Sequence, residues 1–255
     1  MTDSPSKFIW YELMTTDLAG AEAFYKAVIG WKSEQWDGPM PYVIVKVKET
    51  GVGGLMTIPD DAKAMGQSPA WFAYIHAPDV DAATESVRKA GGKVYREPAD
   101  IPEVGRFSVV ADPQGAVFML MAPKGEEGPA IPDGVPGHVG WRELYASDWS
   151  SALDFYSRQF GWTKDEAVDM GPMGTYQLFA IDGQQTGGMM NKPKDTPVPV
   201  WQFYFNVEAL DAALARVKAN KGQILMDPME VPGGSWVAAC QDPQGAAFSL
   251  VSMTR

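Results

Sequence analysis

Apolar and polar positions along the chain follow two periods that alternate in a fixed order. Runs of about five to eight largely apolar residues, many of them β-branched or aromatic, are typical of strands. The first is FIWYELM at 8–14, and the middle of the same half holds WFAYI at 71–75. The other runs that predict strands are YVIVKV at 42–47, GGLMTI at 53–58, KVYREP at 93–98, RFSVVAD at 106–112 and AVFMLM at 116–121, with WVAACQDPQGAAFSLV at 236–251 as a hairpin.

Between these runs the apolar spacing changes to that of helices. After Asp17, which suits a helix N-cap, Ala21, Phe24, Tyr25 and Val28 lie three or four residues apart, and Gly30 ends the pattern. Segments 78–92 and 206–222 show the same period and also end in glycine. The order strand, helix, strands therefore occurs twice in each half of the chain.

The two halves repeat one another. Residues 7–32 align without a gap on 138–163, and the tryptophan, glutamate, aspartate, phenylalanine, tyrosine and glycine positions coincide. Further on, GVGGLM matches TGGMM, PAWFAYI matches PVWQFYF, and DPQGAVFML matches DPQGAAFSL. We predict an α+β protein of four βαβββ modules, paired into domains at 1–127 and 137–255 with curled mixed sheets, and a Pro- and Gly-rich linker at 128–136.

A tandem of βαβββ units with FY and GW after the first strand and DPxGxxF before the last resembles the vicinal oxygen chelate superfamily. This group includes glyoxalase I, bleomycin-resistance proteins, fosfomycin-resistance enzymes and extradiol dioxygenases. The resemblance implies two glyoxalase-like domains with open cavities, and in metal enzymes of the group the ligands lie on the first and last strands. The fold alone settles no chemistry.

The positions that match the family's metal ligands hold other residues here. The first-strand positions are Trp10 and Trp141, and the last-strand positions are Met119 and Ser249. The middle-strand positions fall near Phe72 and Gln202, of which only the glutamine could coordinate. Because zinc and first-row metals prefer imidazole, thiolate or carboxylate ligands, we predict no metal and no other cofactor.

Strand alternation puts the first-strand residues on one face together with a carboxylate. Glu12 and Glu143 are the candidate catalytic residues, because a buried glutamate can act as a general base. The candidate ligand-binding residues are Trp10, Met14, Phe72, Tyr74, Met119, Trp141, Tyr145, Gln202, Tyr204 and Ser249. The alternative is structural: the tryptophans pack in a core, and Arg106, Arg142 or Arg158 pairs with the glutamates. The glycine pairs at 53–54 and 187–188 are predicted to be bends in strands and not phosphate-binding loops.

Composition limits the classes of partner and the cellular location that we expect for this protein. A net charge of −11 without a basic block argues against nucleic acid. No apolar run is long enough to span a bilayer, and the polar N-terminus lacks the plan of a secretory signal, so a cytoplasmic protein is expected. The single cysteine, Cys240, excludes an internal disulfide and is expected in the core. The chain is expected to be a monomer or a homodimer.

Three functions remain open at this stage. The first is a metal-free binding protein of the bleomycin-resistance kind, which holds a small cationic or aromatic molecule between tryptophan and glutamate side chains. The second is a metal-independent lyase, isomerase or hydroxylase-like enzyme in which Glu12 or Glu143 is the general base. The third is an interaction protein whose cavities are vestigial.

Overall fold

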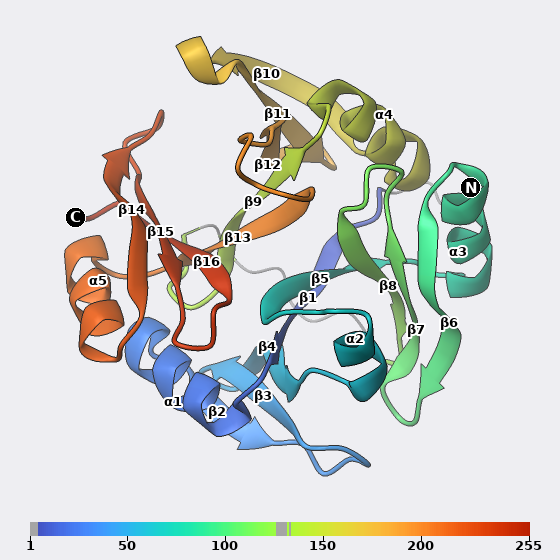
Figure 1. Ribbon diagram of the computed structural model, residues 1–255, viewed down its shortest axis with the longest axis horizontal. Coiled ribbons are helices and arrows are strands. Elements are labelled where there is room, and N and C mark those ends of the chain that lie inside the picture. Colours follow the sequence, from blue (N-terminus) through green and yellow to red (C-terminus); the bar gives the residue numbers. More distant parts are fainter. Residues whose placement is uncertain (1–4, 126–131, 133) are drawn as a thin grey trace. The chain divides into compact units, whose positions relative to one another are not determined.

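The computed structural model contains four successive modules of one strand, one helix and three further strands (Figure 1). It describes residues 5–125, 132 and 134–255, so most of the predicted linker lies outside the described residues. The first module comprises β1 (Phe8–Thr15), α1 (Leu18–Ile29), β2 (Lys32–Gln35), β3 (Tyr42–Val47) and β4 (Thr50–Thr57), followed by a short helix α2 (Asp60–Ala64). The second comprises β5 (Ala70–His76), α3 (Val80–Lys89), β6 (Lys93–Ile101), β7 (Gly105–Ala111) and β8 (Val117–Pro123).

The third and fourth modules repeat this plan. The third comprises β9 (Val139–Ala146), α4 (Trp149–Phe160), β10 (Thr163–Asp169), a 3₁₀ turn η1 (Gly171–Met173), β11 (Thr175–Ile181) and β12 (Gln184–Asn191). The fourth comprises β13 (Val200–Asn206), α5 (Leu210–Ala219), β14 (Gln223–Glu230), β15 (Trp236–Gln241) and β16 (Ala247–Ser252). All the strands and helices predicted from the sequence are present. Strands β2 and β10 complete the three strands that the βαβββ plan requires after each helix, although no apolar run marks their positions, and α2 and η1 were not predicted.

The strands form two mixed eight-stranded sheets, which confirms the predicted α+β class. Their orders are β2-β3-β4-β1-β5-β8-β7-β6 and β10-β11-β12-β9-β13-β16-β15-β14. Within each module the first strand runs parallel to the last, as for β1 with β4 and β13 with β16, while the neighbouring hairpins are antiparallel. The parallel pairing follows from the helix that separates the first strand from the hairpins.

Local sequence sets the bounds of the first helix in each half. The Asp17 side chain accepts a hydrogen bond from the Gly20 amide at the start of α1, and Asp148 does the same for Ser150 in α4. Both helices end at a glycine in the left-handed region, Gly30 at φ 90° and the matching glycine of α4 at φ 74°. These are the capping residues that the repeated motif predicts.

The described chain divides into two compact units, each built from two modules. One, here called the inner unit after its position in the sequence, combines modules two and three (Met1–Ile9, Ala73–Pro129 and Trp141–Trp201). The other, called the outer unit, combines modules one and four (Trp10–Phe72, Ala130–Gly140 and Gln202–Arg255). Each unit thus draws on both halves of the sequence. The division into sequence domains at 1–127 and 137–255 stays a prediction about the repeat.

A buried Trp–Tyr–Asp chain joins the two modules within each unit. In the outer unit, the Trp71 indole donates to the Tyr25 hydroxyl at 2.9 Å, and this hydroxyl donates to Asp242 at 3.1 Å. In the inner unit, Trp201 donates to Tyr156 at 3.1 Å, and Tyr156 donates to Asp112 at 3.2 Å. The tyrosine comes from the FY motif and the aspartate from the DPQG turn of the partner module. The two recurring motifs therefore meet in space.

Aromatic packing surrounds these chains. In the inner unit Tyr156, Trp162 and Phe179 stack in series, with centroid distances of 5.0 and 4.9 Å and planes 8° apart. In the outer unit Tyr25 and Trp71 meet edge to face at 5.2 Å, and Phe205 packs on Trp71. Offset and edge-on contacts of this kind stabilise a core beyond the area that they bury.

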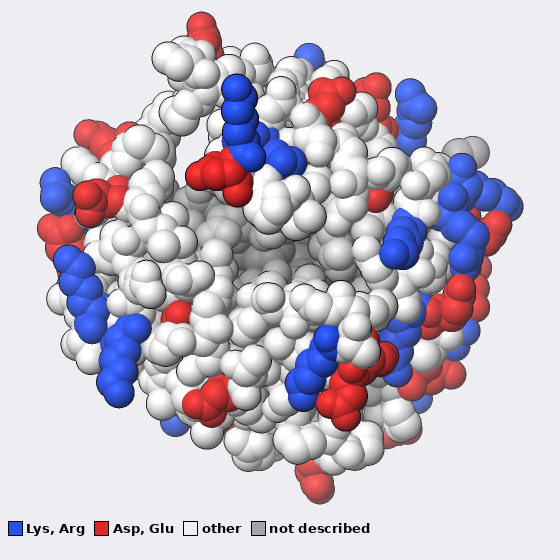
Figure 2. Space-filling model, in the orientation of Figure 1, with Lys and Arg blue, Asp and Glu red and all other residues white. Residues whose placement is uncertain are grey.

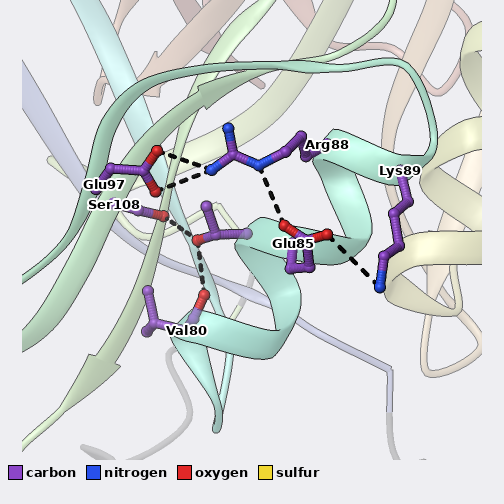
Figure 3. A network of polar contacts seen from close by, with 7 residues as sticks. Val80, Glu85, Arg88, Lys89, Glu97 and Ser108 are labelled. Atoms are coloured by element: carbon purple, nitrogen blue, oxygen red, sulfur yellow. Dashed lines mark hydrogen bonds and ion pairs between the residues drawn. The ribbon is translucent and has the colours of Figure 1, made fainter.

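Helix α3 shows how a surface helix is fixed to its sheet (Figure 3). On the exposed side, Arg88 donates to both carboxylate oxygens of Glu97 on β6, at 2.8 and 2.9 Å, and to Glu85 at 3.1 Å. On the buried side, the Thr84 hydroxyl donates to the Val80 carbonyl oxygen and lies 2.8 Å from the hydroxyl of Ser108 on β7. Exposed ion pairs contribute little to stability, so we expect the buried hydroxyl pair and apolar contacts to determine the position of α3.

The surface carries both signs of charge. On the face shown in Figure 2, acidic and basic side chains are interspersed, and no single-sign block dominates. Among the described residues, no helix is long and apolar enough to span a membrane.

Candidate functional site

The first-strand glutamate of the outer unit lies at the end of a hydrogen-bond chain. Trp10 on β1 donates through its indole Nε1 to the Tyr42 hydroxyl at 2.9 Å. That hydroxyl donates to the Glu12 carboxylate at 3.0 Å. Glu12 is only 4% exposed, whereas Trp10 and Tyr42 are half-buried. We call this group the outer Trp–Tyr–Glu cluster.

The inner unit contains the same arrangement. Trp141 on β9 donates to the Tyr176 hydroxyl at 2.7 Å, and Tyr176 hydrogen-bonds to Glu143, which is 5% exposed. Tyr176 lies near the start of β11, as Tyr42 lies at the start of β3. We call this group the inner Trp–Tyr–Glu cluster. The same hydrogen-bonded Trp, Tyr and Glu thus occur once in each half of the sequence. The arrangement is therefore part of the repeated module.

Glycines on the adjacent parallel strand make room for the tyrosines. Gly54 is the register partner of Glu12, and Gly188 is the register partner of Glu143. A Cβ atom on Gly54 would overlap the Tyr42 hydroxyl, and one on Gly188 would overlap the Tyr176 ring. Glycine within a strand costs about 0.5–1 kcal/mol relative to alanine. The second glycine of each pair is thus explained by the space that the tyrosine needs.

Electrostatics keep both tyrosines protonated. Burial, followed by the negative charge of Glu12, raises the pKa of Tyr42 well above its ordinary value. Burial and Glu143 raise the pKa of Tyr176 in the same way. Each phenol therefore donates to its carboxylate at every pH near neutrality, and each indole in turn donates to the phenol. The hydrogen bonds from the two tyrosines therefore orient the carboxyl groups of Glu12 and Glu143.

The other predicted site residues fall into smaller groups within the units. In the outer unit Gln202 donates to the Ser249 hydroxyl at 3.0 Å, Tyr204 is the register partner of Ser249, and Phe72 is buried. Met14 continues the Trp10 face of β1 and is half-buried. In the inner unit Tyr74 is the register partner of Met119, both buried, and half-buried Tyr145 is the register partner of Met190.

One further aromatic residue distinguishes the outer cluster. Trp36 lies edge-on to Tyr42 at a centroid distance of 5.9 Å and is half-buried. A side chain on Gly38 would overlap the Trp36 ring. Sequence reasoning overlooked Trp36 and both cluster tyrosines. A signal for the tyrosines was available, because each follows a GPM tripeptide in its own half and each half carries a glycine pair soon after.

The arginines considered as partners for the glutamates lie in other interactions. Arg106 pairs with Asp81 and Asp100, and Arg158 lies 4.0 Å from Asp154. The Arg142 guanidinium lies over the Phe8 ring, 5.7 Å from its centroid. For Arg106 and Arg158 the hypothesis of an ion pair with Glu12 or Glu143 is therefore wrong. The tyrosine hydroxyls supply hydrogen bonds to these buried carboxylates.

The side chains of these clusters do not make a suitable set of ligands for a transition metal. Each cluster offers one carboxylate, with a phenol that already donates to it and an indole that is a hydrogen-bond donor only. Met119 is buried next to Tyr74, and Ser249 accepts from Gln202. Within the described residues, no three side chains of His, Cys, Asp or Glu converge to hold a metal ion.

Comparison with known proteins identifies the family. The model of the Glyoxalase/Bleomycin resistance protein/Dioxygenase superfamily matches twice, over residues 7–120 and 136–250. The chain therefore belongs to this superfamily, with one match in each half. This confirms the resemblance inferred from the FY, GW and DPQG motifs.

Relatives and solved structures agree with this assignment. The chain is 31% identical over 247 residues to the putative glyoxylase CFP32 of Mycobacterium tuberculosis, covering 95% of this chain and 93% of that protein. It is 30% identical to the anthracycline biosynthesis protein DauV of Streptomyces sp., covering 98% and 94%. In fold it is similar to the Mn(II)-bound glyoxalase of Novosphingobium aromaticivorans, with a TM-score of 0.68, 17% identity and coverage of 99% and 83%.

Proposed function

We propose that this protein binds a small organic molecule that carries an aromatic ring and a positive charge or hydrogen-bond donor, at its Trp–Tyr–Glu clusters and without a transition metal. The observation that carries the proposal is the buried glutamate of each cluster, held by tyrosine and tryptophan. A buried charge is costly, and a well-packed apolar cluster of similar volume is often as stable or more stable. Two glutamates kept at such a cost favour a role in recognition.

The chemistry of the cluster suits such a ligand. A carboxylate beside aromatic rings attracts a cation through its charge and through the negative faces of the rings. In the outer cluster, Trp36 adds a second indole next to Tyr42. The relative named for anthracycline biosynthesis supports an aromatic ligand class, since anthracyclines are fused-ring compounds.

A matched set of probes tests the proposal. Naphthylmethylammonium, naphthalenemethanol and naphthoate share one ring system and differ in charge, and their binding can be measured by calorimetric titration at fixed ionic strength. We expect the cation to bind about tenfold more tightly than the neutral alcohol, corresponding to about 1.4 kcal/mol. Equal binding of all three probes, or preference for the anion, would contradict the proposal.

Variants assign the binding to the clusters. Glu12→Gln and Glu143→Gln keep the shape and a hydrogen-bond acceptor but remove the charge, so each should abolish the preference for the cation at its own cluster. Glu97→Gln, on the exposed end of the Arg88 pair, is the matched control and should leave binding unchanged. If Glu97→Gln weakens binding as much as the cluster variants, the effect is that of net charge alone.

A second function, metal-independent proton transfer by Glu12 or Glu143, is favoured by the burial of these carboxylates next to a phenol. The same variants distinguish it from simple binding. A general base lost in Glu12→Gln lowers kcat while a bound product analogue keeps its affinity. For a binding protein, affinity falls and no turnover is seen with either form.

A further inference from the structure

A pocket lies in the outer unit, and none of the residues of the Trp–Tyr–Glu cluster lines it. It has a volume of about 700 Å³ and lies where the end of α1, the turn between β3 and β4, and the start of α5 meet. Four basic residues are among those that line it: Lys32, Lys46, Lys48 and Arg216. Glu49 and Glu208 are the acidic residues of the lining, so its net charge is +2 in a chain whose net charge is −11.

Two of the four cations have no carboxylate partner among the described residues. Lys32 pairs with Glu49 at 3.6 Å, and Lys46 pairs with Glu34 on β2. By contrast, Lys48 forms no ion pair within the described residues, and Arg216 directs Nε and one terminal nitrogen to the Val28 carbonyl oxygen at 3.2 and 2.9 Å. The contact with Val28 fixes the guanidinium at the pocket without neutralising it.

The inner unit provides an internal comparison, because the repeat places an equivalent residue at each position. Pairing of β2 with β3 and of β10 with β11 makes Lys32 equivalent to Thr163 and Lys46 equivalent to Ala180. The same register makes Lys48 equivalent to Asp182, and both have φ 56°. Each basic residue of the strands and turn is therefore replaced by a neutral or acidic one.

The helices show the same difference. In the inner unit the N-cap residue of α3 is Asp79, whose side chain accepts from the Ala82 amide, whereas the N-cap residue of α5 is Ala209, which makes no side-chain hydrogen bond. Seven residues further on, Arg216 takes the place of Ser86, which donates to Gln159. The outer unit thus lacks the acidic cap and carries a guanidinium at the pocket, where the inner unit has Asp79 and Ser86. The fold itself does not require Ala209 and Arg216 at these positions, because the inner unit adopts the same fold with other residues there.

From this asymmetry we infer that the pocket of the outer unit is a binding site for a small organic anion with a phosphate or carboxylate group, contacted by Lys48 and Arg216. Arginine binds such groups in a bidentate manner, and lysine supplies a mobile point charge. The site is separate from the Trp–Tyr–Glu clusters, so its failure would leave the proposed function untouched.

Titration of the full chain with inorganic pyrophosphate and, in parallel, with succinate tests the site. Sodium chloride at the same ionic strength is the reference. We expect saturable binding of at least one anion with a stoichiometry of one per chain. The anion that binds identifies the group, phosphate or carboxylate, that the pocket recognises.

Two lysine variants make the test specific. Lys48→Asn and Lys221→Asn both replace an exposed lysine in a left-handed turn, with φ 56° and 67°, but only Lys48 lines the pocket. We expect Lys48→Asn to weaken anion binding about fivefold, as loss of about 1 kcal/mol of Coulomb attraction predicts, and Lys221→Asn to leave it unchanged. The absence of saturable binding of both anions, or equal effects of the two variants, would overturn the inference.

Discussion

The hydroxyl of Tyr156 is predicted to be a main stabilising contact between the two modules of the inner unit. Tyr156→Phe removes one oxygen atom and leaves the stacked ring in place. The Asp112 carboxylate then loses a donor at 3.2 Å, and the Trp201 indole loses its acceptor at 3.1 Å. Both partners are buried, at 2% and 4% exposure, so neither is readily rescued by solvent.

The size of the effect follows from these two losses. A hydrogen bond to a charged group contributes about 1.5–3 kcal/mol, and an orphaned buried donor costs about 1–3 kcal/mol. Asp112 keeps two backbone donors, Gln114 and Ala116, which limits the loss. We therefore expect Tyr156→Phe to lower the free energy of unfolding of the inner unit by about 3 kcal/mol. Tyr25→Phe, with Asp242 and Trp71, should do the same in the outer unit.

The pH dependence of the destabilisation by Tyr156→Phe provides a second test. Burial raises the pKa of Asp112, while the Tyr156 hydrogen bond lowers it. Since the pKa is raised on folding, the stability contributed by this group is fully present below the unfolded pKa and is lost as the pH rises through the folded pKa. Without the hydroxyl the folded pKa rises further. The destabilisation by Tyr156→Phe should therefore be larger at pH 7 than at pH 4.

Urea unfolding followed by near-ultraviolet circular dichroism at both pH values measures this effect, with calorimetry to separate the two units. Tyr95→Phe is the control, because Tyr95 is exposed and its hydroxyl removal should change stability by less than about 0.5 kcal/mol. The reasoning is refuted if Tyr156→Phe costs no more than Tyr95→Phe, or if its cost does not change between pH 4 and pH 7.

Three further results are expected. Gly54→Ala should displace Tyr42 and lower the free energy of unfolding of the outer unit by about 1–3 kcal/mol. Unfolding curves of the double mutant should show a smaller loss of stability when Tyr42→Ala is already present. Burial raises the pKa of Cys240 to about 12, so its thiol should react with a disulfide reagent only after unfolding. Protein purified without chelator should contain far less than one transition metal per chain by elemental mass spectrometry, since the donor set of the clusters is poor; a stoichiometric metal would contradict this.

The sequence predicts the modules well because each is marked locally. Asp17 and Gly30 begin and end a helix through their own backbone and side-chain preferences, and the DPQG turn limits the last hairpin. The strand β10 is different: five of its seven residues, in TKDEAVD, are polar or charged, and it pairs along the edge of its sheet with β11. No periodicity within the segment predicts that pairing, which depends on its partner strand.

The candidate site could be predicted in part. Alternation along β1 places Trp10 and Glu12 on one face, which the structure confirms by joining both to one hydroxyl. That hydroxyl belongs to Tyr42, thirty residues further along the chain, and strand alternation carries no information about it. The glycine pair was a usable clue, since a glycine opposite a glutamate in a strand needs a reason, and a large side chain lying across it is one.

The pairing of modules leads to a final prediction about half of the chain. Tyr25 donates to Asp242 rather than to the aspartate of its own half, and Asp112 accepts from Tyr156. A fragment of residues 1–127 thus keeps one tyrosine and one aspartate, each without its partner. Because the DPQG turn is the same in both halves, a second copy can supply what is missing. We expect this fragment to form a homodimer with a concentration-dependent unfolding midpoint, as light scattering and urea titration would show. A stable folded monomer at micromolar concentration would mean that the buried Trp–Tyr–Asp chains are not required to hold the modules together.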